Sequence, residues 1–343
     1  MASVVHIVWG LATGGIETML VNIVNRQIAS ADVTLIVIND LVNQQLLERI
    51  DSRVNVILLR RKIGSRNPLP FVKLNALLLR LKPTAIHSHS YTIASYLLPS
   101  LRRRSLLTMH TTLSIGNMTR SALLKYSRVY SISHSVQSML SERFGIASKV
   151  IYNGIDFGCF KQREALQSGD IRIVQLSRLI PEKGHSLALQ ALKELENYPW
   201  QLDIIGSGEC EQSLKQLAQS LGIANRVHFL GSKSQEYLFE NLKAYDILLQ
   251  PSTAEGFGLT VIEAMAAGVA VVASDIDGLK EATAYGELAT LFKSGDAHAL
   301  AEALKALFDH PAELSELQRV QSAAAEKFHI ASTVKQYLKE YEQ

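Results

Sequence analysis

The stretch that decides the fold is Pro251–Gly268, PSTAEGFGLTVIEAMAAG, which follows a strand-like apolar run at Ile247–Gln250. The pattern predicts a strand, a short loop that carries Gly256 and Gly258, and a helix that ends at Gly268. Glycine lets a loop backbone approach a ligand closely. The N-terminus of the helix that follows the loop favours a phosphate group, because its unpaired N–H groups and positive dipole end point at the loop.

Two glutamates belong to this stretch. Glu255 stands in the loop, and Glu263 stands inside a helix that is otherwise Leu, Thr, Val, Ile, Met and Ala. Acidic side chains are seldom fully buried without a partner. A phosphate ligand rich in hydroxyl groups would account for both acids, with its hydroxyls bonded to the two carboxylates. The alternative is an ordinary strand–turn–helix with a partnered core glutamate, since strand–glycine–helix signals are common.

Composition predicts a globular protein. The chain has 343 residues, 47% hydrophobic and 20% charged, which indicates about two domains. Its longest apolar runs have the length of strands, so we expect no transmembrane helix. The start, MASVVHIVWGL, has no basic region before its apolar run, so we expect a first strand there and no signal peptide. Cys159 and Cys210 form neither a metal-binding spacing nor a disulfide framework, which fits a reducing cytoplasm.

Charge is divided unevenly along the chain. Residues 1–168 hold 20 Lys and Arg against 8 Asp and Glu, whereas residues 169–343 hold 15 against 24. A basic N-terminal half suits nucleic acid or an anionic membrane surface. Few aromatic residues lie among the cations, which disfavours a nucleic-acid stacking platform. A solvated surface remains the alternative for any single basic cluster.

The N-terminal half alternates strand-like runs with helices, which predicts parallel sheets built from strand–helix units. The predicted strands are Val4–Trp9, Val33–Asn39, Val54–Leu59, Thr84–Ser88, Ser105–His110, Val129–Ser133 and Lys149–Tyr152. The predicted helices are Ile16–Ala29, Leu69–Leu81 and Val136–Phe144. The periodicity lapses at Asp156–Gly169, which we interpret as a linker.

A second series of the same kind follows. Its predicted strands are Ile171–Leu176, Gln201–Ile205, Val227–Leu230, Ile247–Gln250, Val269–Ala273 and Ala289–Leu291. Beside the helix ending at Gly268, its predicted helices are Ser186–Leu195, Glu211–Leu221, Glu236–Leu242, His298–Phe308, Glu313–Phe328 and Ser332–Tyr341. The sequence therefore predicts an α/β protein of two doubly wound domains, residues 1–165 and 166–329. Ligands of such sheets bind at the carboxyl ends of strands, so we expect the site in a cleft between the domains.

Two loops after predicted strands carry residues suited to a phosphorylated ligand. Arg178 and Lys183 follow Ile171–Leu176 and end at a glycine turn; together they suit a diphosphate, the first as a fork and the second as a point charge. A solvated loop is the alternative. Gly206 begins the turn after the next strand and either lines the site with backbone or forms a plain tight turn.

The first loop, Gly10–Gly15, lies where such folds hold phosphate. Gly14 and Gly15 suit close approach of the backbone to a ligand or acceptor, although a plain tight turn is the alternative. Glu17 directly afterwards would repel a phosphate.

Histidines and acids offer weaker candidates. His110 ends a predicted strand among threonines, either as a site residue or as a structural histidine. His87 and His89 resemble a metal pair but lack a third ligand. Asp275 and Asp277 could bind a divalent ion with a diphosphate, but no further acid converges on their turn, so we interpret them as solvated loop residues. The sequence contains no P-loop, which disfavours ATP hydrolysis.

Taken together, the chain resembles the retaining glycosyltransferase family 4, the group 1 transferases of the two-domain GT-B fold. The resemblance covers nearly the whole chain. It rests on GGIE (Gly14–Glu17), MHTT (Met109–Thr112), YNGID (Tyr152–Asp156), SRLIPEKG (Ser177–Gly184), IGSGE (Ile205–Glu209) and PSTAEGFGLTVIEAMAAGVAVVAS (Pro251–Ser274). One departure stands after the last motif, where Glu287 replaces a second glycine usual in the family.

The resemblance implies a role for each matched residue on the donor. Glu263 is expected on the ribose hydroxyls of the nucleotide, Glu255 near the hydroxyls of the donor sugar, and Arg178 and Lys183 on the diphosphate. His110 is expected to contact the donor sugar.

Backbone groups have implied roles as well. The N–H groups of Phe257, Gly258 and Leu259 are expected to bind sugar and phosphate. Gly14 and Gly15 would let the first loop approach phosphate and acceptor. The last helix is expected to pack back on the N-terminal domain, as such helices do in this fold.

The implied activity is transfer of a hexose or N-acetylhexosamine from a nucleotide sugar, with UDP the expected carrier and GDP-mannose the main competitor. No cofactor or metal is expected. The family and the basic N-terminal half together suggest a lipid-linked glycan or a lipopolysaccharide or O-antigen precursor as acceptor, at the inner face of the cytoplasmic membrane, and no nucleic-acid partner. A nucleotide-sugar 2-epimerase and a non-catalytic nucleotide-sugar-binding subunit are the alternatives.

Overall fold

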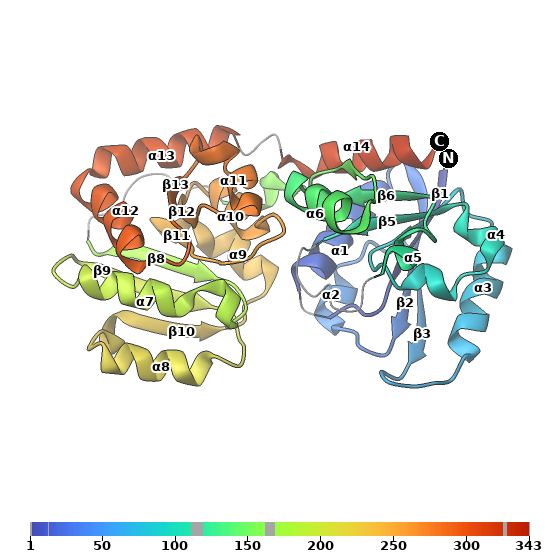
Figure 1. Cartoon of the computed structure of the whole chain (residues 1–343), viewed down its shortest axis with the longest axis horizontal. Coiled ribbons are helices and arrows are strands. Elements are labelled where there is room, and N and C mark those ends of the chain that lie inside the picture. Colours follow the sequence, from blue (N-terminus) through green and yellow to red (C-terminus); the bar gives the residue numbers. More distant parts are fainter. Residues whose placement is uncertain (1, 13, 111–118, 162–168, 325–327, 343) are drawn as a thin grey trace. The chain divides into compact units, whose positions relative to one another are not determined.

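The computed structural model describes residues 2–12, 14–110, 119–161, 169–324 and 328–342 (Figure 1). Contacts divide the chain into two compact units, one formed by Met1–Ile155 with Phe328–Gln343 and the other by Asp156–Lys327. The predicted junction near residue 165 lies outside the described residues, and the contacts change unit at Ile155. We describe each unit by itself.

The N-terminal unit is built on a parallel sheet. Within the described residues its seven strands run in the order β3-β2-β1-β4-β5-β6-β7. The strands are β1 Ala2–Val8, β2 Ala31–Asn39, β3 Asn55–Arg61, β4 Ala85–Ser88, β5 Ser105–Met109, β6 Arg128–Ser131 and β7 Lys149–Val150. The α-helices are α1 Gly15–Gln27, α2 Gln44–Glu48, α3 Leu69–Leu81, α4 Pro99–Arg102, α5 Arg120–Leu123, α6 His134–Phe144 and α14 Ile330–Tyr341.

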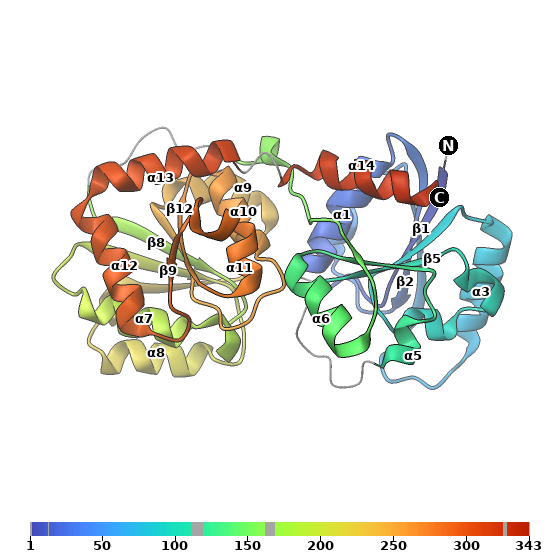
Figure 2. The same cartoon turned by 45° about the horizontal axis from the view of Figure 1, so that its top comes forward.

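Strand β1 shows how this sheet is covered. Successive side chains of a strand point to opposite faces. Val5 and Ile7 belong to a buried apolar cluster with Leu74 and Leu78 of α3. His6 points to the other face, which α1 and α14 cover (Figure 2). The last helix therefore packs against α1 and β1 of the N-terminal unit.

The C-terminal unit repeats this plan. Its six strands in the described part of the chain run in the order β10-β9-β8-β11-β12-β13, all parallel. The strands are β8 Ile171–Leu176, β9 Trp200–Ile205, β10 Val227–Gly231, β11 Ile247–Gln250, β12 Ala270–Ser274 and β13 Thr290–Phe292. The α-helices are α7 His185–Glu194, α8 Glu211–Ser220, α9 Gln235–Asn241, α10 Leu259–Ala266, α11 Asp277–Ala282, α12 Ala297–Asp309 and α13 Pro311–Ala324.

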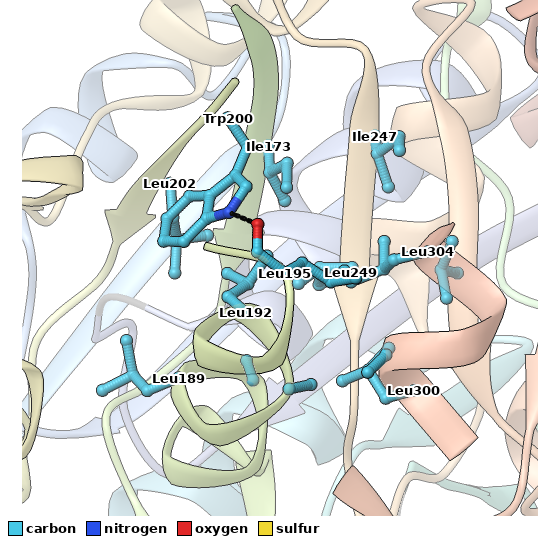
Figure 3. Close-up of a cluster of buried hydrophobic side chains, with 14 of the residues drawn as sticks. Ile173, Leu189, Leu192, Leu195, Trp200, Leu202, Ile247, Leu249, Leu300 and Leu304 are labelled. Carbon is cyan, nitrogen blue, oxygen red and sulfur yellow. Dashed lines mark hydrogen bonds between the residues drawn. The ribbon is translucent and has the colours of Figure 1, made fainter. Parts of the chain in front are cut away.

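A large apolar cluster packs helices α7, α8, α12 and α13 against the sheet (Figure 3). Leu192 of α7 and Leu300 of α12 lie over strand residues such as Ile247, and all three are fully buried. Trp200 is fully buried as well, and its indole Nε1 donates to the Leu195 carbonyl at 2.9 Å. That bond satisfies the one polar group of a large apolar side chain. This core holds the strand ends, and hence the loops beyond them, in fixed positions.

The predicted fold class is confirmed. The bounds of β8, β11 and α3 agree with the predicted ones, and the central helix ends at Ala266 with Gly268 in a left-handed conformation just beyond it. The short helices α2, α4, α5 and α11 were not predicted. The sequence had placed Asp277 in a turn, and this was wrong: Asp277 is the first residue of α11. Among the described helices none is long and apolar enough to cross a bilayer.

Candidate active site

Strand order places one topological switch point in each sheet. The chain leaves β1 toward β2 on one side and returns to β4 on the other, and it leaves β8 toward β9 and returns to β11. Ligands of open α/β sheets bind at the carboxyl ends of the strands beside such a point. The loops that the sequence singles out as candidates follow β1, β4 and β5 in one unit and β8, β9 and β11 in the other.

The loops after β8 and β11 touch one another. Thr253 N donates to the Glu182 carbonyl at 2.9 Å. Gly184 has φ +67°, and a Cβ on it would stand 2.0 Å from the Pro251 carbonyl oxygen. Only glycine combines this conformation with so close a backbone contact. Gly184 therefore allows the two loops to pack closely against each other.

Through this contact Lys183 and Glu255 form an ion pair. Their side chains retain only 12% and 18% of their exposure, so the pair is largely shielded from water. Gln250 Nε2 lies 3.3 Å from the same Glu255 oxygen, and Gln250 Oε1 accepts from Thr260 at 3.2 Å. The structure thus brings two predicted site residues together and ties them to the first turn of α10.

The N-terminus of α10 lies next to this pair. Gly258 caps the helix with φ +87°, and a Cβ there would stand 2.7 Å from Leu279 Cδ2. Phe257 is 1% exposed, so its ring belongs to the core and only its backbone can face a ligand. Leu259 begins the helix. The helix N-terminus favours negative charge, and Lys183 adds a cation that Glu255 partly offsets.

Glu263 and Gly206 take supporting positions. Glu263 is half-buried on α10, and Gln235 Nε2 of α9 donates to it at 2.9 Å. Gly206 has φ +146°, and a Cβ there would stand 1.9 Å from the Ser177 carbonyl oxygen. The turn after β9 therefore presses against the turn after β8, which carries Arg178.

Arg178 differs from Lys183. Its side chain is exposed, and its guanidinium has no hydrogen bond or ion pair with any residue that the structure describes. Its backbone carbonyl instead lies 3.2 Å from His185 Nε2. Burial lowers the pKa of His185 to about 4, so this imidazole is neutral at pH 7. Arg178 is placed on the same loop as Lys183 with its cation available to a ligand.

In the N-terminal unit, the first loop is lined by an acid. Gly14 is the N-cap of α1, and a Cβ on it would stand 2.5 Å from Glu17 Oε2. No described atom lies within 4 Å of a Cβ added at Gly15. A carboxylate over the helix N-terminus opposes a phosphate there, whereas it can accept a hydroxyl hydrogen. The geometry favours a hydroxyl-bearing ligand over a phosphate at Gly14 and Gly15. Thr13 lies outside the described residues.

His110 is one end of a chain of imidazoles in which His6 and His110 are buried and His89 is half-buried. His110 Nε2 lies 2.9 Å from His89 Nδ1, and His89 Nε2 lies 3.0 Å from His6 Nδ1. His6 Nε2 lies 2.7 Å from Gln27 Oε1 of α1. His110 is 8% exposed, and its Nδ1 has no hydrogen-bond partner among the described residues.

The sequence showed no third ligand beside His87 and His89, but the structure places His6 next to them. Ligand atoms of His6, His87 and His89 lie within 4.8 Å of one another. However, both ring nitrogens of His87 are already hydrogen-bonded, Nδ1 to the Tyr341 hydroxyl at 2.7 Å and Nε2 to Thr108 Oγ1 at 2.8 Å. The cluster is a hydrogen-bonded network in which a metal would have to displace existing bonds.

Two protein-family models match this chain over the regions that contain these loops. A model described as "Glycosyl transferases group 1" matches residues 158–328, and one described as "Glycosyltransferase Family 4" matches residues 13–158. The chain belongs to this glycosyltransferase family. Together the two matches contain every motif on which the resemblance was based.

Individual relatives are similar over part or all of the chain. The D-inositol 3-phosphate glycosyltransferase of Rhodococcus erythropolis is 32% identical over 185 residues, which cover 51% of this chain and 42% of that protein. The chain therefore spans less than half the length of such curated relatives. The Anabaena HepE structure with UDP and glucose has a TM-score of 0.84 at 21% identity and full coverage of both chains. The lipopolysaccharide outer core galactosyltransferase WaaB has a TM-score of 0.74 at 19% identity and 98% coverage of both. These likenesses show the GT-B fold.

Sequence reasoning about this family member missed the residues that organise its candidate site. Gln250 at the end of β11 holds Glu255, and Gln27 and His6 stand behind His110. One signal was available for the last two. His6 interrupts the apolar run VVHIV, and Gln27 falls on the buried face of α1 with Leu20, Ile23 and Val24. A polar side chain at a buried position needs a partner.

Proposed function

We propose that the protein transfers a sugar from a nucleotide sugar to a hydroxyl group. The observation that carries this proposal is the Lys183–Glu255 pair beside the N-terminus of α10, at the switch point of the C-terminal sheet. A nucleoside diphosphate needs positive charge and backbone N–H groups, and a sugar needs carboxylate acceptors. This corner offers both, and the family match points to the same chemistry.

The leaving diphosphate sets the main task of the site. Lys183, Arg178 and the first turn of α10 stabilise the negative charge that develops as the glycosidic bond breaks. We propose that the configuration at the sugar is retained by attack on the same face, with the departing phosphate oxygen accepting the proton of the attacking hydroxyl. This route requires no side-chain general base and no metal ion.

Further residues would orient the donor. Glu263 is proposed to accept the ribose hydroxyls, with Gln235 holding its carboxylate. Glu255 and His110 are proposed to bind hydroxyls of the sugar, and Gly206 and Gly258 allow the backbone to approach it. UDP is the proposed carrier; it is the nucleotide in the HepE structure, whose fold this chain shares.

The acceptor is proposed to be held at a membrane. Helix α3 exposes the apolar residues Leu69, Val72 and Leu79, and the cations Lys73 and Arg80 are exposed on the same helix. An exposed apolar face flanked by cations suits the surface of an anionic bilayer. A lipid-linked glycan or a lipopolysaccharide or O-antigen precursor, reached by a peripherally bound enzyme at the inner face of the cytoplasmic membrane, fits this surface.

A panel of nucleotide sugars tests the proposal. Thermal shift identifies the donor that binds, and mass spectrometry then follows transfer to lipid-linked glycan acceptors. We expect one UDP-sugar to stabilise the protein and to glycosylate an acceptor with retained configuration. Conversion of the donor to its 2-epimer would identify a 2-epimerase instead. Donor binding without turnover on any acceptor would favour a non-catalytic binding subunit.

A further inference from the structure

The imidazole chain behind His110 has a direction. A neutral imidazole carries one N–H donor and one lone-pair acceptor, and the hydrogen bond of one nitrogen fixes the role of the other. In a chain in which each ring bonds the next, the role of the first nitrogen therefore decides the role of the last. The four groups in order are Gln27, His6, His89 and His110.

Gln27 is the hydrogen-bond acceptor at the start of this chain. Its Nε2 donates to the Tyr341 hydroxyl at 3.1 Å, which leaves Oε1 to face His6 Nε2 at 2.7 Å. A carbonyl oxygen can only accept, so His6 Nε2 carries the proton and His6 Nδ1 is an acceptor.

The same assignment passes along the chain. His89 Nε2 donates to His6 Nδ1, so His89 Nδ1 accepts. His110 Nε2 donates to His89 Nδ1, so His110 Nδ1 carries a lone pair. That nitrogen is the buried one that has no partner in the described part of the chain. Turning the Gln27 amide over would reverse every bond and would convert His110 Nδ1 into a donor.

We propose that Gln27, acting through His6 and His89, is a positioning residue that fixes His110 as the Nε2–H tautomer and so offers the Nδ1 lone pair to a sugar hydroxyl. The nature of the ligand rests on the function proposed above, whereas the tautomer rests on the hydrogen-bonded chain alone.

Burial keeps the chain neutral, as this assignment requires. Desolvation lowers the pKa of His6 and of His110 to about 4 and the pKa of His89 well below its usual value. Protonated rings would donate from both nitrogens and would break the sequence of bonds. At neutral pH each ring therefore has one donor and one acceptor.

Tyr341 bonds the nitrogen side of this amide. Its hydroxyl accepts from Gln27 Nε2 and can donate to His87 Nδ1, which lies 2.7 Å away. Tyr341 stands in α14, 314 positions from Gln27. The C-terminal helix thus belongs to the hydrogen-bonded network that ends at His110.

The test is nitrogen NMR of the full-length protein labelled with 15N-histidine, because pyridine-type and pyrrole-type ring nitrogens have well separated shifts. His110 signals are assigned by their loss in His110→Asn. Two variants act on the amide: Gln27→Met removes it, and Tyr341→Phe removes only the hydroxyl that accepts from its Nε2. Tyr337→Phe is the matched control, since this buried hydroxyl of the same helix bonds Thr108 and not Gln27.

We expect a single Nε2–H tautomer of His110 in the wild type and in Tyr337→Phe, and a mixture of tautomers in Gln27→Met and Tyr341→Phe. An Nδ1–H tautomer in the wild type would overturn the proposal. So would a wild-type tautomer in either amide variant, or a mixture in Tyr337→Phe. The measurement needs no transfer activity, so its failure is distinct from a failure to find a donor or acceptor.

Discussion

Lys183 donates a hydrogen bond to Glu255 although the two residues are 72 positions apart in the chain. The pair joins the loop after β8 to the loop after β11, and both side chains are largely shielded from water. Removing one member of a partly buried ion pair destabilises the fold, because the remaining charge is left shielded from water without a partner. The same two residues that we propose to bind the diphosphate and the sugar therefore also stabilise the geometry of their loops.

Removal of either cation should abolish most transfer. We expect Lys183→Ala and Arg178→Ala to lower kcat/KM by on the order of 10²-fold or more, by analogy with the loss of one oxyanion donor. Initial rates with the identified donor measure this. Lys193→Ala is the control, because this lysine of α7 pairs with Glu196 at the surface. Turnover close to wild type in Lys183→Ala would remove this residue from the site.

The contact at Gly184 predicts a large loss of stability on adding one methyl group. Gly184→Ala would place a Cβ 2.0 Å from the Pro251 oxygen, so backbone must move. Gly295→Ala is the matched control, with a similar φ of +79° but no atom of the described residues within 4 Å of the added carbon. We expect the control to lose roughly 1–2 kcal/mol, the cost of a left-handed non-glycine residue. Calorimetry should show a clearly greater loss for Gly184→Ala, and equal losses would contradict the contact.

Acid should destabilise the protein through its buried histidines. Burial lowers the folded-state pKa of His6, His110 and His185 to about 4, below the unfolded value of 6.5. The unfolded chain therefore binds more protons between pH 6.5 and pH 4. Their contribution is complete above pH 6.5 and is lost as the pH falls toward 4.

Denaturant unfolding at pH 7.5 and pH 5 measures this dependence. Exposed His298 acts in the opposite sense, because Glu194 raises its pKa, and its contribution is lost as the pH rises. His298→Gln should therefore leave the acid-induced loss in place. Equal stability at the two pH values in the wild type would contradict the burial of neutral imidazoles.

Transfer should not require a metal ion. Positive charge for the diphosphate comes from Lys183, Arg178 and the N-terminus of α10 in the proposed mechanism. We expect full activity after dialysis against EDTA, measured as initial rates with and without added Mg²⁺ or Mn²⁺. Strict dependence of transfer on a metal ion would contradict this mechanism and would make Asp275 and Asp277 the candidate metal ligands.

The basic, apolar face of α3 should bind anionic membranes. The double variant Lys73→Glu, Arg80→Glu should lose flotation with vesicles that contain anionic lipid, because reversed charges are repelled. Lys293→Glu with Lys305→Glu is the matched control, since it reverses two exposed lysines of the C-terminal unit. Equal binding of the wild type to neutral vesicles would contradict an electrostatic mode.

Much of this architecture is encoded locally. Parallel strands covered on both faces are continuous apolar runs, so such runs in the sequence predicted the strands. The glycines and cations after Leu176 and Gln250 indicated the candidate binding loops. The short helices α2, α4, α5 and α11 were not predicted, because four to six residues carry too little periodic signal. Asp277 is an example: the sequence placed it in the turn after Val269–Ala273, whereas it begins α11.

By itself, then, the sequence determined the alternation of strands and helices, the family, and the residue types at the strand ends. Which of those residues meet was decided only by the tertiary structure. His6 bonds His89 because the crossover after β3 returns the chain to the other side of β1 and makes β4 its neighbour. Gln27 meets Tyr341 because the last helix returns to the first sheet. Periodicity reports whether a side chain is buried; the identity of its hydrogen-bond partner depends on strand order and helix docking, which no local pattern carries.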